Sequence, residues 1–89
     1  MVEIKVEKPS DEKLKSLGVD EWSLWECEPS TFNWEYDDKE TCYVLEGRVK
    51  VKVPGGEVEF GKGDLVTFPR GLKCTWKVIQ KIRKVYKFG

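Results

Sequence analysis

Few side chains in this sequence could hold a transition metal or act as a nucleophile. The 89 residues include no histidine, and imidazole is the commonest protein ligand of such metals. The three cysteines, Cys27, Cys42 and Cys74, are an odd number and form no C-x-x-C pair. This pattern argues against both a disulfide framework and a zinc ribbon. We therefore expect reduced thiols and no metal or other cofactor.

Aromatic side chains form the second group with chemical potential, because they can bind ligands. Phe32, Trp34 and Tyr36 alternate with other residues, so in an extended strand their rings lie on one face. Such stripes most often belong to the core. Two alternatives remain open: the aromatic wall of a small-molecule pocket, or a sheet face that meets a partner subunit.

Short alternating runs separated by turn residues must position these side chains. The pattern is typical of an antiparallel sandwich or barrel. Pro54-Gly55-Gly56 predicts a hairpin turn, and Pro69-Arg70-Gly71 predicts a tight turn. A first strand is expected around Val2, Ile4 and Val6, and further strands over residues 22–27, 32–36, 40–46, 48–53, 57–60, 65–68, 72–78 and 81–88.

One short helix is expected between the first two of these strands. Ser10 is a good N-cap residue, and Asp11 and Glu12 place acids in the first helical turn. Gly18 follows Leu17 and ends the segment. The rest of the chain shows no linker or repeat, so we predict a single domain over residues 1–89.

Composition and charge narrow the classes of partner. Lys plus Arg and Asp plus Glu both number 16, so no basic field draws the chain toward nucleic acid. The basic run at 77–87 is interpreted as a solvated strand face. No apolar run approaches the roughly 20 residues of a membrane span, and the first residues do not resemble a signal peptide. We expect no membrane association and a cytoplasmic location.

Residues 63–74 carry the first sign of a family. They read Gly-Asp-Leu-Val-Thr-Phe-Pro-Arg-Gly-Leu-Lys-Cys and resemble the second cupin motif, in which Gly, Pro, Gly and His stand at fixed spacing. Gly63, Pro69 and Gly71 are in place, and Cys74 stands where the histidine would be.

Residues 40–47 resemble the end of the first cupin motif, a Glu and a Gly separated by six residues. Glu40 and Gly47 match it, whereas the upstream His-x-His pair falls on residues 33 and 35 or 34 and 36, none of which is histidine. Over residues 32–88 the chain resembles the small DUF861-type cupins related to ureidoglycine aminohydrolase and to ethanolamine-utilisation cupins.

The resemblance implies an all-β, single-domain cupin: a jelly-roll-like β-barrel with one short N-terminal helix. It also implies a homodimer, because cupins commonly pair through their sheets. The larger enzymes of the family hold a divalent metal with His and Glu side chains. Of those ligand positions, only that of Glu40 is kept here.

Strand alternation extends the argument from Glu40 to a candidate pocket. If Glu40 points into the barrel, as the motif's Glu does, then Cys42 shares its face, and Cys74 and Trp76 point inward from a later strand. The candidate ligand-binding residues are therefore Glu40, Cys42, Cys74, Trp76, Tyr36 and Trp34.

Each polar member of this set has a structural interpretation beside the functional one. Cys42 and Cys74 are expected to be small buried fillers, although together with Glu40 they would form an incomplete ligand shell for zinc. A buried Glu40 needs a compensating group. Either an internal donor such as Arg83 or Tyr86 supplies it, or a cationic or hydrogen-bond-donating ligand does.

Two classes of function follow. The first is a metal-independent barrel that binds a small polar metabolite near Glu40 and Trp76. The second is an enzyme acting on a small nitrogen-containing metabolite, a ureide or an amine as the resemblance suggests, with Glu40 as acid or base and Cys74 or Tyr36 assisting. No catalytic residue is assigned, because no pair of nucleophile and base is visible.

Overall fold

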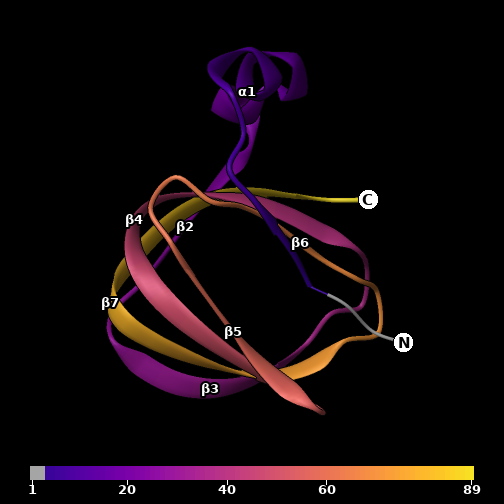
Figure 1. Cartoon of the computed structure of the whole chain (residues 1–89), viewed down its shortest axis with the longest axis vertical. Helices are drawn as coiled ribbons and strands as arrows, with labels where there is room; N and C mark the ends of the chain where they lie inside the picture. Colours follow the sequence, from indigo (N-terminus) through magenta and orange to yellow (C-terminus); the bar gives the residue numbers. More distant parts are fainter. Residues whose placement is uncertain (1–3) are drawn as a thin grey trace.

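The chain forms one antiparallel sheet that curls into a barrel, described by a computed structural model over residues 4–89. The strand order is β1-β6-β4-β7-β2, with β3 also paired to β7 and β5 to β4. Figure 1 shows these strands around a common interior, with α1 outside one end. The strands are β1 Lys5–Glu7, β2 Ser23–Cys27, β3 Ser30–Glu35, β4 Glu40–Val53, β5 Gly56–Gly61, β6 Leu65–Phe68 and β7 Lys73–Phe88.

The short N-terminal helix forms where the capping residues predict it. Helix α1 spans Asp11–Leu17, and the Ser10 hydroxyl accepts a hydrogen bond from the Lys13 backbone at 3.2 Å. Gly18 ends the helix, and a 3₁₀ turn, Val19–Glu21, leads into β2. Within residues 4–89, neither helix has the length and apolar character needed to cross a membrane. The expected first strand is β1, although its Val2 lies outside the described residues.

Two pairs of predicted strands are single long strands. Residues 40–46 and 48–53 join as β4, and 72–78 and 81–88 join as β7. The β4–β7 pairing is irregular around residues 44–49, so each strand bends there without ending. Gly47 permits the bend: its φ is +97°, and a Cβ at this position would lie 2.3 Å from the Lys81 carbonyl oxygen.

The bend divides each long strand into two halves that pair with different neighbouring strands. Residues 73–78 of β7 pair with β3, and residues 82–86 pair with β2. β4 pairs with β6 through residues 40–43 and with β5 through residues 48–53. Because both halves of β7 turn their inner faces toward the same interior, side chains far apart along the strand can meet.

The core lies inside this curl and follows the predicted alternation. Glu40, Cys42 and Val44 are buried on β4, and Cys74 and Trp76 are buried on β7. Beyond the bend in β4, burial moves to odd positions such as 49 and 51, as an irregular pairing requires. The predicted all-β barrel with one short N-terminal helix is therefore confirmed.

Candidate functional site

The barrel interior contains a cavity of about 440 Å³ that opens to solvent. Its walls are mainly aromatic, its polar groups are few, and it draws residues from β2, β3, β4, β7 and the segment between β3 and β4. Such a combination is characteristic of small-molecule sites. The lining residues are Trp25, Cys27, Phe32, Trp34, Tyr36, Glu40, Trp76, Lys84, Tyr86 and Phe88.

A buried ion pair provides the main charged feature of this cavity. Lys84 Nζ donates a hydrogen bond to Glu40 Oε2 at 2.7 Å, and each side chain is only 6% exposed. Moving two charges out of water is costly, and their attraction offsets that cost only at close range. A pair buried this deeply constrains both side chains to one arrangement.

Aromatic rings surround the ammonium end of the pair. Lys84 Nζ lies 4.7 Å from the ring centroid of Trp76, 5.0 Å from that of Trp25, 5.7 Å from that of Tyr86 and 5.9 Å from that of Phe68. The faces of aromatic rings carry negative potential, so each of these contacts favours a cation. Glu40 and the four rings together form a cation cage, and the protein's own Lys84 occupies it.

The curl of β7 is what brings this cage together. Trp76 and Lys84 are eight positions apart on one strand, which is roughly 26 Å along a straight strand. Their contact therefore requires the bend between the two halves of β7. Trp25 is the direct cross-strand neighbour of Lys84, and Tyr86 lies opposite Cys42 on β4.

Four of the six residues that the sequence proposed for a pocket line this cavity: Glu40, Trp76, Tyr36 and Trp34. The two cysteines do not. Cys42 is 0% exposed within the core, and Cys74, which is 7% exposed, places its thiol 3.6 Å from the backbone carbonyl oxygen of Trp34.

Sequence reasoning missed Lys84, and for an identifiable reason. The basic run at 77–87 predicts a solvated strand face, and for Lys84 that prediction is wrong, because only 5% of the residue is exposed. The partner of Glu40 is Lys84 and neither Arg83 nor Tyr86. Cys74, Trp76 and Val78 point inward, and every second side chain of a strand lies on the same face. Lys84 is an even number of positions from these residues, so the alternation predicts that it points inward too.

Three other polar groups near the pair are held in neutral form. The hydroxyl of Tyr36 accepts a hydrogen bond from Trp76 Nε1 at 3.1 Å. Burial, reinforced by the negative charge of Glu40, keeps the pKa of Tyr36 well above its ordinary value. Burial likewise raises the pKa of Cys42 to about 12 and raises the pKa of Cys74. These thiols are poor nucleophiles near neutral pH.

The metal that the cupin motifs imply does not fit these residues. Among residues 4–89, no three His, Cys, Asp or Glu side chains gather closely enough to hold a metal ion. The ammonium of Lys84 also stands 2.7 Å from Glu40, directly beside the one retained ligand position. A divalent cation would meet a fixed positive charge there.

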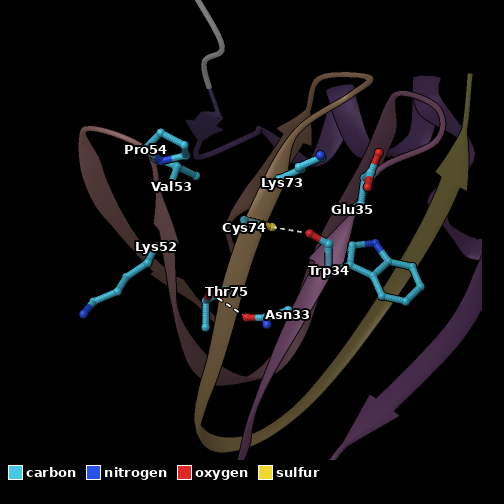
Figure 2. Close-up of a pocket in the computed structure, with 9 residues that line it drawn as sticks. All are labelled: Asn33, Trp34, Glu35, Lys52, Val53, Pro54, Lys73, Cys74 and Thr75. Atoms are coloured by element: carbon cyan, nitrogen blue, oxygen red, sulfur yellow. Dashed lines mark hydrogen bonds between the residues drawn. The ribbon is translucent and has the colours of Figure 1, made fainter.

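A second hollow, of about 600 Å³, is lined by residues of β3, the end of β4 and the start of β7. Figure 2 shows its lining residues, with Asn33 and Thr75 joined by a 2.9 Å hydrogen bond and Lys52 extending away from the strands. Its charged side chains, Lys52, Lys73 and Glu35, are exposed. Because the inner cavity alone combines a buried charge pair with enclosing rings, it is the stronger candidate site.

The curled antiparallel barrel with its aromatic interior defines the chain as a cupin, and comparison with known proteins agrees. The chain belongs to the EutQ-like cupin domain family, whose sequence model matches residues 14–86. A DUF861-family protein from Thermotoga maritima has a solved structure that is 53% identical, with a TM-score of 0.96, over 98% of this chain and 100% of that one.

The more distant relatives are longer proteins. The curated protein "Acetate kinase EutQ" of Clostridioides difficile (strain 630) is 29% identical over 63 residues, which are 71% of this chain and 40% of that protein. The solved structure of Clostridium difficile EutQ is 28% identical, with a TM-score of 0.66, over 71% of this chain and 50% of that one. The chain thus spans half or less of these relatives' length.

Proposed function

We propose that the barrel binds a small organic molecule, without a metal, through a flat or apolar body and one hydrogen-bond acceptor. The observation that carries this proposal is the Glu40–Lys84 pair at the wall of an open, ring-lined cavity. A charge pair with one face toward a solvent-accessible space offers polar anchoring, and the rings offer apolar contact area.

The arrangement of the pair selects the polar group of the ligand. An ammonium has three N–H donors, and Lys84 gives one of them to Glu40. Its other protons can be donated to a carbonyl or carboxylate oxygen in the cavity. A cationic ligand is disfavoured, because Lys84 already fills the cage that Glu40 and the rings form.

Two benzene derivatives that differ only in their polar group test this selection. Benzamide presents a neutral acceptor and benzylammonium presents a cation. We expect benzamide to shift the indole NMR signals of Trp25 and Trp76, and benzylammonium to bind at least about tenfold more weakly, a difference of about 1.4 kcal/mol. Equal or tighter binding of benzylammonium, or unchanged indole signals with both compounds, would contradict the proposal.

Removing the internal cation should reverse the preference. In Lys84→Met, the carboxylate of Glu40 and the rings are left without their ammonium, so benzylammonium should bind more tightly than benzamide. Lys81→Met is the matched control, because Lys81 lies on the same strand with its side chain 51% exposed. The control should retain the order of the parent protein.

An enzyme acting on a small nitrogen-containing metabolite is the second candidate function. The favouring observation is the 2.7 Å contact between Glu40 and Lys84, because a carboxylate and an amine at this distance can exchange a proton during a reaction. Compounds that raise the melting temperature in a screen of ureides and amines should be incubated with the protein and followed by NMR. Conversion of a bound compound would favour this candidate, and unchanged compound would favour simple binding.

Association of two copies through their sheets is a further part of the proposal. Leu24 and Phe88 are half exposed, and burying such side chains in an interface would stabilise a small domain. Light scattering of the purified protein measures the mass directly. A monomer at all concentrations would refute the homodimer.

A further inference from the structure

We infer that Lys84 also captures carbonyl compounds covalently, as a reversible protonated imine with an aldehyde or ketone whose apolar body lies in the cavity. The inference rests on the proposed function, because the carbonyl oxygen is the acceptor that the site selects. It adds a covalent reaction to the proposed binding: the amine of Lys84, the cation in the cage, forms a bond to the ligand.

Lys84 is placed for this role by its position in the cavity. It is the only lysine among the residues that line it, and its Nζ is surrounded by the rings of Trp25, Trp76 and Tyr86. A carbonyl compound stacked against those rings would hold its carbon near Nζ. Fixing two reactants in this way replaces a bimolecular encounter by an effectively unimolecular step.

Glu40 supplies the proton transfers that imine formation needs. Glu40 Oε2, at 2.7 Å, takes a proton from the ammonium, and the freed Nζ electron pair attacks the carbonyl carbon to form a C–N bond. The carbonyl π electrons move to oxygen, which takes a proton from nitrogen to give a carbinolamine. Glu40 then returns its proton to the hydroxyl group, water leaves, and the nitrogen electron pair completes the C=N bond.

The product keeps the charge that the site is built to stabilise. A protonated imine carries one positive charge on nitrogen, as the ammonium did, and Glu40 is again a carboxylate. The four rings within 6 Å of Nζ and the carboxylate therefore continue to stabilise the cation.

Reductive trapping tests the inference with the unmodified protein. Benzaldehyde and sodium cyanoborohydride at neutral pH convert any imine into a stable benzylamine, which intact mass and peptide mapping then locate. We expect Lys84 to be benzylated at least about tenfold faster than the exposed Lys81 and Lys87 of the same strand. Labelling of Lys84 no faster than that of Lys81 and Lys87 would overturn the inference.

Two variants separate a chemical role from a structural one. Lys84→Arg keeps a cation beside Glu40 but cannot form an imine, so labelling at this position should vanish while Lys87 labelling continues. Glu40→Gln removes the proton acceptor, and Lys84 labelling should slow by roughly 10²-fold relative to Lys87 in the same sample. An unchanged ratio of Lys84 to Lys87 labelling in Glu40→Gln would remove Glu40 from the mechanism and overturn the inference as stated.

The outcome also distinguishes this inference from the proposed function. If benzamide binds in the cavity but Lys84 is not labelled preferentially, only the covalent step is wrong. If benzamide fails to shift the indole signals of Trp25 and Trp76 and Lys84 is also not labelled preferentially, the cavity is not a ligand site and both proposals fall.

Discussion

Breaking the Glu40–Lys84 pair should strongly destabilise the barrel. In Lys84→Met, the apolar side chain replaces the ammonium and leaves the carboxylate of Glu40 buried without its partner, with a side chain only 6% exposed. Glu40→Gln is the milder change, because the amide oxygen of Gln can still accept the hydrogen bond from Lys84 Nζ.

The magnitude follows from the burial and length of the contact. Removing one member of a buried pair costs about 3–5 kcal/mol, and we expect Lys84→Met to fall in that range. Loss of charge with the hydrogen bond retained should make Glu40→Gln cost about 1–3 kcal/mol. For a domain of this size each kcal/mol lowers Tm by roughly 4–8 °C, so Lys84→Met should melt roughly 12–40 °C below the parent protein.

Urea unfolding followed by tryptophan fluorescence measures these costs. The double variant Glu40→Gln/Lys84→Met should be more stable than the sum of the two single losses predicts, because it leaves no uncompensated charge. Lys81→Met, at a pair with Glu28 in which both side chains are at least half exposed, should change stability by less than about 1 kcal/mol. A Lys84→Met variant within about 1 kcal/mol of the parent, or strictly additive losses, would refute the argument.

Three further predictions concern the cysteines and the bend. Thiol labelling of the native protein should modify the partly exposed Cys27 first, whereas Cys42 and Cys74, which are buried, should react only after unfolding; rapid native labelling of either would indicate a reactive thiol. Burial raises the pKa of Cys42 from 9.0 to about 12 in the folded protein, so the buried thiol contributes its full stability below pH 9 and loses that contribution as the pH rises toward 12. By about pH 10 the loss in the free energy of unfolding is about 1.4 kcal/mol. In urea melts across this pH range, the parent protein should lose this much more stability than Cys42→Ala. Gly47→Ala should cost more than Gly55→Ala, because both glycines have positive φ but only at Gly47 would a Cβ collide with backbone; equal losses of roughly 1–3 kcal/mol in denaturant melts would indicate conformational strain alone.

Absence of a bound transition metal is a separate prediction from the same site. Elemental analysis of untagged protein should find less than stoichiometric zinc, manganese, iron or nickel, since the sequence offers no imidazole. One metal per chain that survives mild chelation would contradict it, and a histidine tag would invalidate the measurement.

Local chemistry made much of the fold predictable. Ser10 and Gly18 delimit α1, and β4 buries every second residue from Glu40 to Val44 as the alternation predicts, because capping and period-2 burial act within a few residues. At the bends of β4 and β7, by contrast, the sequence pattern predicts that one strand ends and another begins. A bulge keeps a strand hydrogen-bonded on both sides while changing its direction, and only the neighbouring strands reveal that continuity.

The candidate site was predictable in its faces but not in its partners. The resemblance to the cupin motifs implies that Glu40 points inward, strand alternation extends the same direction to Trp76, and both side chains line the cavity. Alternation could not show that the charge compensating Glu40 comes from Lys84, which lies in a basic run that also contains exposed lysines. A run of charged residues usually indicates a solvent-exposed segment. Because side chains of a strand alternate between its two faces, one charged residue of such a run can still point into the core.

By itself, then, the sequence determined the class of this protein: an alternating, turn-punctuated chain without histidine, whose cupin motifs retain Glu40 as the one ligand position. Only the tertiary structure decided what stands beside that carboxylate. Glu40 and Lys84 are 44 residues apart, and Lys84 meets Trp76 because β7 curls back around the same interior. Side-chain direction is set locally by the strand, but the distance between two inward side chains is set by how the whole sheet closes.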